Sequence, residues 1–228
     1  MRICHTGLAV SALVIWLYAC NPTGTPRQQP QATTADTTAT SAAASMAIIM
    51  FFGNSLTYGY GLDDPAQAFP ARIQARIDSL GLAYRVVNAG ISGETTADGL
   101  SRIGWTLRQP IDIFVLELGG NDGLRGLPPE QTRQNLQAII DSVRQAQPQT
   151  RILLTGMMAP PNMGADYTRR FREVYPALAK ENDIAFLPFL LEGVAGEPQL
   201  NQADGIHPTA EGHEIVSAHV WTVLREML

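Results

Sequence analysis

Hydrophobic residues between positions 46 and 228 gather in short runs, and longer stretches of mixed hydrophobic and polar residues separate these runs. The runs show little polar alternation, which is typical of strands buried on both faces of a parallel sheet. We therefore predict five strands, at residues 47–52, 84–88, 111–118, 151–156 and 184–187.

The stretches between the runs have the periodicity of helices with one hydrophobic face. In residues 130–146, hydrophobic side chains recur at spacings of three and four, between prolines at 128 and 129 and a proline at 148. We predict helices near residues 66–80, 95–108, 130–146, 166–181 and 209–227. This alternation predicts a three-layer α/β/α sandwich with a five-stranded parallel sheet and right-handed crossovers.

The N-terminal part of the chain has a different character. A basic N-terminal end precedes an apolar stretch, residues 8–18, which is shorter than the ~20 residues that span a bilayer but fits the core of a signal peptide. Residues 17–20, LYAC, resemble a bacterial lipobox. This resemblance implies a lipoprotein signal peptide at 1–19 and acylation of Cys20, with an ordinary secretory signal as the alternative.

Residues 21–45 are rich in Thr, Ala, Pro and Gln and contain almost no large hydrophobic side chain. A segment of this composition cannot bury enough surface to offset its ordering entropy, so we expect a flexible tether. We assign residues 20–45 to the lipidated cysteine and tether, and residues 46–228 to one folded domain. Because Cys4 is the only other cysteine and would be removed with the signal peptide, neither a disulfide nor thiolate chemistry is expected.

The overall composition narrows the class of partner. The chain has 228 residues, 45% of them hydrophobic, and a formal net charge of −5 at pH 7. This hydrophobic content is enough for a sizeable core. The negative charge argues against a nucleic-acid partner, which requires a basic surface. The sequence leaves the oligomeric state open.

Four polar, glycine-rich segments have a special place in this predicted fold. Three follow the first three strands, and the fourth precedes the last helix. The segments are GNSLT at 53–57, AGISG at 89–93, GGNDG at 119–123 and DGIHP at 204–208. Since ligands of an open parallel sheet bind beyond the carboxyl ends of its strands, the fold should bring these segments to one rim.

The side chains of these segments suit acyl transfer. A nucleophilic serine requires a base, and the base requires an acceptor that fixes its tautomer; His207 and Asp204 can supply both to Ser55. The N–H groups of Ser55 and Gly93 and the side-chain amide of Asn121 are candidate donors to a tetrahedral intermediate. Taken alone, each residue is more simply a helix cap or a turn residue. Their order at successive strand ends favours catalysis.

The segments GNSLT, ISGETT, GGND and DGIHP resemble the four sequence blocks of the SGNH hydrolases, also called the GDSL esterase/lipase family. GGNDGLRGLPPEQTRQNL, YPALAKEND and LPFLLEG also resemble the bacterial acyl-thioesterase, arylesterase and lysophospholipase branch, and the resemblance extends over about residues 47–227. It implies a flavodoxin-like sandwich with Ser55 as nucleophile, His207 as general base and Asp204 orienting His207. It also implies an oxyanion hole made by Ser55, Gly93 and Asn121, without a cofactor or metal ion.

One position departs from the family pattern, because Asn54 stands where the first block usually has aspartate. That aspartate is not a member of the catalytic triad, so we expect the mechanism to be intact. The loss of its charge changes the hydrogen bonding near Ser55 in a direction that the sequence does not define.

The resemblance implies a metal-independent serine esterase acting on short-to-medium acyl, aryl, thio- or lysophospholipid esters, with a carbohydrate O-acetylesterase as the alternative. Met157, Met158 and Pro160 follow the fourth predicted strand and are candidates for an acyl pocket; the alternative is a loop packed on the core. We expect the enzyme to be membrane-anchored in the bacterial cell envelope, on its periplasmic or outer-membrane face, where it would meet lipid and glycan esters.

Other classes of protein explain less of the sequence. A non-catalytic lipoprotein that binds acyl chains or glycans would not need the three residues of the predicted triad. An α/β-hydrolase is disfavoured because the chain has no Gly-x-Ser-x-Gly motif. His207, His213 and His219 are six residues apart, about 240° on a helix, and so do not form one metal-binding face. A phosphate- or flavin-binding module would explain only the first segment.

Overall fold

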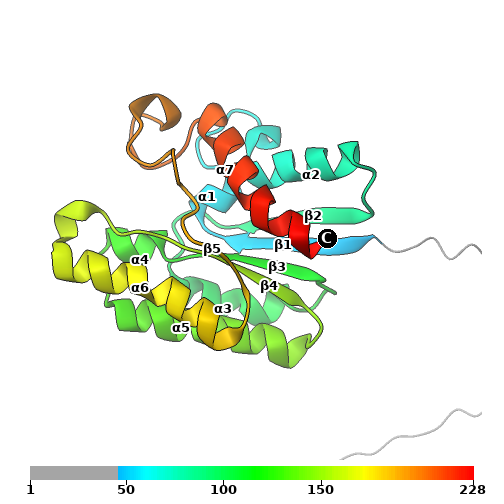
Figure 1. Ribbon diagram of the computed structural model, residues 1–228, viewed down its shortest axis with the longest axis horizontal. Helices are drawn as coiled ribbons and strands as arrows, with labels where there is room; N and C mark the ends of the chain where they lie inside the picture. The colour runs from blue at the N-terminus through cyan, green and yellow to red at the C-terminus, as the bar shows by residue number, and fades with distance from the viewer. Residues whose placement is uncertain (1–45) are drawn as a thin grey trace, which may run out of the picture. The chain divides into compact units, whose positions relative to one another are not determined.

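The computed structural model describes residues 46–228 and is drawn as a ribbon in Figure 1. The predicted signal peptide, the predicted acylation site at Cys20 and the predicted tether lie outside the described residues.

A parallel sheet of five strands lies at the centre of the fold, in the order β2-β1-β3-β4-β5. The strands are β1 (Ala47–Gly53), β2 (Tyr84–Gly90), β3 (Ile113–Glu117), β4 (Arg151–Thr155) and β5 (Ala185–Leu187). In the register of the sheet, Gly53 pairs with both Gly90 and Glu117. The first three strands therefore end at the same level, and the segments that follow them begin side by side.

Five helices of eleven or more residues surround the sheet, and their apolar faces cover it. They are α2 (Phe69–Ser79), α3 (Thr96–Thr106), α5 (Pro129–Ala146), α6 (Ala165–Asn182) and α7 (Ala210–Leu224). Figure 1 shows α2 and α7 on one face of the sheet and α3, α5 and α6 on the other. The predicted three-layer sandwich with a five-stranded parallel sheet is confirmed.

The core lies on both faces of the sheet, as the apolar runs indicated. Residues 49–52 of β1 are fully buried, and the ring of Phe52 packs on Phe114 of β3 with 5.3 Å between centroids. The predicted stripe of α5 is also fully buried; it consists of Leu136, Ile139, Ile140 and Val143. Sequence periodicity therefore identified the side chains that hold the helix layers against the sheet.

The structure differs from the sequence-based prediction mainly at the ends of elements. β3 begins at Ile113 and ends at Glu117, and the last helix gives way to a 3-10 turn, Arg225–Met227. Two short α-helices were missed, α1 (Ser55–Tyr58) and α4 (Gly120–Leu124). Each has only about one turn, so neither shows a hydrophobic period in the sequence.

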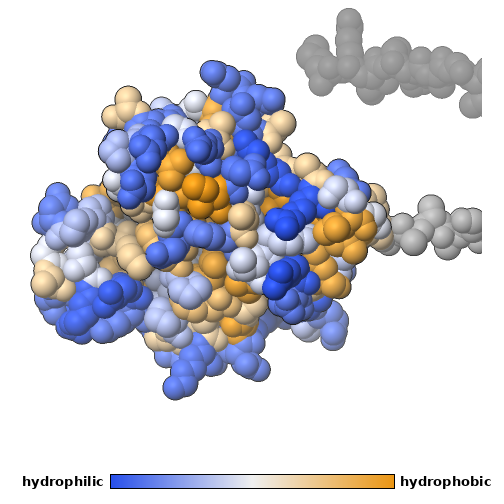
Figure 2. All heavy atoms as spheres, turned by 45° about the horizontal axis from the view of Figure 1, so that its top comes forward, coloured by the Kyte–Doolittle hydropathy of each residue, from blue (hydrophilic) through white to orange (hydrophobic). Residues whose placement is uncertain are grey.

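The surface of the domain mixes polar and apolar side chains. On the face that Figure 2 presents, hydrophilic residues divide the hydrophobic surface into separate patches. None of the helices within residues 46–228 is long and apolar enough to cross a membrane.

Candidate active site

Ser55 lies at the first position of α1, directly beyond the carboxyl end of β1. Asn54 caps this helix, because its Oδ1 accepts a hydrogen bond of 2.9 Å from the N–H of Leu56. Gly59 ends the helix in the left-handed conformation, with φ of 84°. The tight turn between Asn54 and Gly59 thus presents a serine hydroxyl at the rim of the sheet.

Ser55, His207 and Asp204 form a continuous chain of hydrogen bonds. The Nε2 atom of His207 is 2.9 Å from Ser55 Oγ, and its Nδ1 is 2.6 Å from Asp204 Oδ2. Since a carboxylate accepts only, Nδ1 carries the proton in the neutral ring and Nε2 is left to accept from the serine hydroxyl. The sequence-predicted triad is brought together with the geometry that general-base catalysis requires.

Asp204 is held as an anion by the turn that follows it. Its Oδ1 accepts hydrogen bonds from the backbone N–H groups of Ile206 and His207, at 2.9 and 3.0 Å. Burial alone would raise the pKa of Asp204, but these bonds and the His207 ring outweigh it and lower the pKa to about 2. The carboxylate is therefore charged at every pH at which a histidine can act as a base.

The three predicted oxyanion donors lie on neighbouring segments of this rim. Within residues 46–228, the N–H groups of Ser55 and Gly93 have no hydrogen-bond partner. Gly93 has φ of 84°, a conformation that a residue with a Cβ rarely adopts. One N–H of the Asn121 amide donates to the carbonyl of Glu94 at 2.8 Å, which fixes the amide and leaves its second N–H available.

Two residues that the sequence did not single out support the histidine. The ring of Tyr60 packs against the ring of His207 with 4.7 Å between centroids. The side-chain amide of Gln202 donates to the carbonyls of Tyr60, at 2.7 Å, and Pro208, at 3.0 Å. Gln202 therefore ties the loop after α1 to the loop that carries His207, and only the three-dimensional fold reveals this connection.

A third missed residue is Glu117, the last residue of β3 and fully buried. Its carboxylate accepts hydrogen bonds from Asn54 and Thr57, on either side of Ser55. The signal was visible, because the predicted strand 111–118, which we expected to be buried on both faces, carries a glutamate next to its last residue. A buried carboxylate needs partners, and here the partners belong to the serine turn.

Large hydrophobic side chains surround this site. Nine such side chains in the described part of the chain are exposed, and six of them lie on the short helices and loops of the active-site rim. These six, which we call the apolar collar, are Tyr58, Tyr60, Ile91, Leu124, Met158 and Ile206. Of the predicted pocket residues, Met158 belongs to the collar and Pro160 is half-buried nearby in sequence, whereas Met157 packs inside the core.

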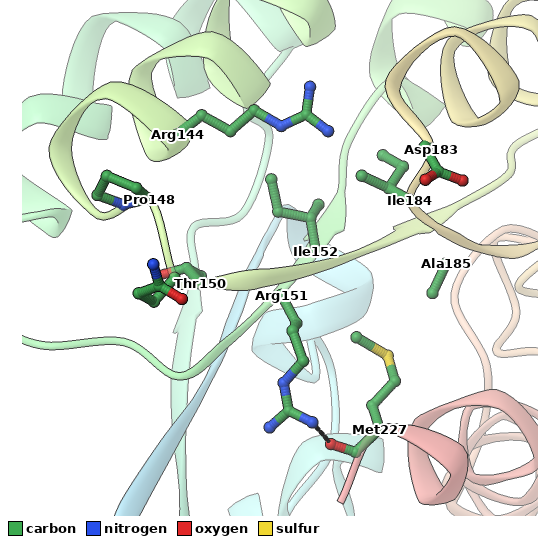
Figure 3. Close-up of a pocket in the computed structure, with 10 residues that line it drawn as sticks. Arg144, Pro148, Thr150, Arg151, Ile152, Asp183, Ile184, Ala185 and Met227 are labelled. Carbon is green, nitrogen blue, oxygen red and sulfur yellow. Dashed lines mark hydrogen bonds between the residues drawn. The ribbon is translucent and has the colours of Figure 1, made fainter.

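A separate hollow of about 360 Å³ lies near the amino ends of β4 and β5, whereas the candidate active site lies beyond the carboxyl ends of the strands (Figure 3). Its charged side chains are Arg144, Arg151 and Asp183, and Arg151 donates to the carbonyl of Met227. This lining offers no nucleophile with an adjacent base. Within the described residues, no group of three His, Cys, Asp or Glu side chains is placed to hold a metal ion.

Comparison with known proteins gives a consistent result. The sequence model of the "GDSL-like Lipase/Acylhydrolase family" matches residues 51–215. "Esterase TesA" of Pseudomonas aeruginosa is 40% identical over 186 residues, which cover 81% of this chain and 91% of that protein. "Thioesterase 1/protease 1/lysophospholipase L1" of Escherichia coli is 41% identical over 77% of this chain and 82% of that protein. The solved "Crystal Structure of TesA" superimposes with a TM-score of 0.75 at 41% identity, covering 79% of this chain and 99% of the other.

Proposed function

Because this chain belongs to the GDSL-like lipase/acylhydrolase family and is a serine ester hydrolase, we propose that Ser55 is its nucleophile, His207 its general base and Asp204 the residue that orients His207. The observation that carries this assignment is the hydrogen-bonded chain from Ser55 Oγ through the His207 ring to Asp204. The side chains are already within the distance at which a proton moves between them.

In the proposed mechanism, Ser55 Oγ attacks the carbonyl carbon of the ester and its proton passes to Nε2 of His207. The N–H groups of Ser55 and Gly93 and the Asn121 amide stabilise the resulting oxyanion. The bond to the leaving alcohol then breaks, and the proton on Nε2 passes to the alcohol oxygen. Water, deprotonated by His207, attacks the acyl-enzyme, releases the carboxylic acid and regenerates Ser55.

We propose substrates with an apolar acyl or aryl group, of short to medium length. The apolar collar supports this, because exposed hydrophobic side chains grouped around a polar catalytic centre mark a binding surface rather than a solvated one. The names of the relatives agree in kind: besides the esterase and the thioesterase/lysophospholipase, a 32% identical protein of Vibrio mimicus is named "Arylesterase".

We also propose that acylation of Cys20 anchors the enzyme in the bacterial cell envelope. The support is the sequence around Cys20 alone. Wild-type chain expressed in a bacterium should incorporate labelled palmitate and fractionate with membranes, and Cys20→Ser should do neither. Equal labelling of the two proteins would disprove this proposal.

The catalytic proposal is tested with residues 46–228 and p-nitrophenyl esters from acetate to decanoate. We expect hydrolysis that survives EDTA, and Ser55→Ala should lower kcat by at least about 10⁴-fold. The rate should be greatest for an acyl chain longer than acetate. Turnover by Ser55→Ala would disprove the nucleophile, whereas turnover of acetate alone would favour a carbohydrate O-acetylesterase.

A further inference from the structure

A carboxylate without a cation lies beneath the proposed nucleophile. Glu117 is 0% exposed at the end of β3, and none of the ion pairs within residues 46–228 includes it. Acidic side chains are rarely buried completely unless they are paired, because the charged form loses its hydration. The position of Glu117 therefore calls for compensating interactions.

All the hydrogen bonds to Glu117 come from the turn that carries Ser55. Oε2 accepts from the N–H of Asn54 at 3.1 Å, from the N–H of Thr57 at 3.3 Å and from the hydroxyl of Thr57 at 2.7 Å. Oε1 accepts from the amide of Asn54 at 2.9 Å. Gly53 permits this close approach, since a Cβ there would lie 2.4 Å from Oε2. The carboxylate thus binds the turn on both sides of Ser55.

Asn54 has a fixed orientation within this network. Its Oδ1 accepts from the N–H of Leu56 while its Nδ2 donates to Glu117, so its oxygen and nitrogen cannot exchange places without loss of both bonds. The aspartate that the family usually carries at this position would place a second carboxyl group against Oε1. Such a pair requires a shared proton. With asparagine, Oε1 of Glu117 accepts from an amide and no shared proton is required.

We propose that Glu117 is a positioning residue for catalysis: as the acceptor of the hydrogen bonds from Asn54 and Thr57, it holds residues 54–57 so that Ser55 Oγ meets Nε2 of His207, and Asn54 is its matching donor. This inference rests on the proposed role of Ser55 as nucleophile. Glu117 contacts none of the reacting atoms, and Asn54 meets them only through its Oδ1, which lies 3.5 Å from Ser55 Oγ. Their effect is on the placement and the reactivity of the serine hydroxyl.

Burial opposes the ionisation of Glu117, and the hydrogen bonds from the serine turn offset only part of this cost. Burial raises the pKa of Glu117 to about 7, against the hydrogen bonds from Thr57 and Asn54, which lower it. Tyr175 of α6 has a pKa raised by burial and by nearby negative charges, those of Asp122 and Glu117. Arg102 of α3 donates to the carbonyl of Gly53 but is paired with Glu94. No cation bonds to Glu117, and Asn54 and Thr57 are its only hydrogen-bond donors among the described residues.

An exchange of amide and carboxylate tests this inference directly. Glu117→Gln alone places an amide donor against the amide of Asn54, and Asn54→Asp alone places two carboxyl groups together. In the double variant the introduced aspartate accepts from the introduced glutamine, while the aspartate still accepts from Leu56 and the glutamine oxygen still accepts from Thr57. The double variant therefore restores every bond, with donor and acceptor reversed only between the side chains at 54 and 117.

We expect each single variant to lower kcat at pH 8 at least about 10-fold with KM within about threefold, since small displacements of a nucleophile cost rate rather than binding. The second-order rate of Ser55 labelling by a fluorophosphonate should fall in parallel. The double variant should return to within about threefold of wild type for both quantities. Val143→Ala, a core change in α5, is the matched control that should lower the melting temperature and leave kcat unchanged.

Other results would contradict the positioning role of Glu117 and Asn54. A double variant whose kcat is the product of the two single effects would overturn the inference, and so would single variants within twofold of wild type. If the variants at 117 do not fold, Asn54→Asp decides: its kcat relative to wild type should fall as pH rises from 5 to 9, because the shared proton is lost. A constant ratio would overturn the inference. Turnover by Ser55→Ala would instead refute the proposed function itself.

Discussion

At the scale of single residues, Asn121 tests the proposed oxyanion hole. One N–H of its amide is fixed by the carbonyl of Glu94, and we propose that the other donates to the oxyanion. Asn121→Ala should lower kcat by about 10²–10³-fold and change KM little, because the oxyanion exists only in the transition state and the intermediate. Steady-state hydrolysis of p-nitrophenyl butyrate measures both constants.

Asn135→Ala is the matched control for this prediction. Its amide donates to the hydroxyl of Thr96 at 3.0 Å and has no part in the proposed mechanism, so kcat should stay within about twofold of wild type. If Asn121→Ala raised KM and left kcat unchanged, the amide would bind ground-state substrate and the oxyanion hole would rest on backbone N–H groups alone.

The residues of the candidate site were predictable from sequence to different degrees. Ser55, His207 and Asp204 stood in recognisable segments, and the predicted parallel sheet was enough to place them on one rim. Gln202 was not predictable, because an amide that bridges two loops has no pattern along the chain. Glu117 was within reach, since a charge in a buried strand requires partners, but the identity of those partners depends on the register of β1 and β3.

At the scale of elements, strands and long helices were found within a few residues of their true ends, because their apolar faces repeat over several turns or residues. The two short helices on the rim, α1 and α4, escaped prediction. Each is held by its neighbours rather than by its own period: α1 depends on the Asn54 cap and on the close packing of β2. Local pattern therefore fails where tertiary contacts define the structure.

The contact between β2 and α1 gives a prediction at this scale. A Cβ at Gly90, the last residue of β2, would lie 2.3 Å from the backbone nitrogen of Tyr58 and 2.8 Å from the backbone carbon of Thr57. Gly90→Ala should push α1 away from the sheet. We expect a loss of about 1–3 kcal/mol in the free energy of unfolding and at least about a 10-fold fall in kcat. Denaturant unfolding and ester hydrolysis measure these two effects.

Gly104→Ala is the control, because it should raise the free energy of unfolding where Gly90→Ala lowers it. Gly104 lies inside α3, and a Cβ there would meet no atom within 4 Å. Alanine is a better helix former than glycine, so this variant should gain about 0.5–1 kcal/mol and keep wild-type kcat. Equal stability of Gly90→Ala and wild type would show that α1 can shift without cost, contrary to the packing of this rim.

At the scale of the whole molecule, two buried groups give stability opposite dependences on pH. Burial raises the pKa of Glu117 to about 7, from about 4.5 in the unfolded chain. Its contribution to the free energy of unfolding is therefore complete below pH 4.5 and is lost as pH rises through 7. Burial, with lesser effects of Arg72 and His207, lowers the pKa of His213 to about 4. The contribution of His213 to the free energy of unfolding is complete above its pKa in the unfolded chain, about 6.5, and is lost as pH falls toward 4.

These dependences nearly cancel between pH 4.5 and 6.5, so the wild-type domain should keep an almost constant free energy of unfolding there. The variants should diverge from it in opposite directions. His213→Asn, which keeps an acceptor for the N–H of Phe69, should gain up to about 3 kcal/mol relative to wild type as pH falls from 7 to 4. Glu117→Gln lacks the opposing group and should lose stability more steeply over the same interval.

Urea unfolding of the three proteins at pH 4, 5, 6 and 7 measures this divergence. The comparison uses slopes rather than absolute stabilities, so the packing cost of each substitution, which is the same at every pH, drops out. Three parallel curves would mean that neither group changes its proton affinity on folding. Glu117 would then be solvated in the native state, and the network beneath Ser55 would lose its electrostatic basis.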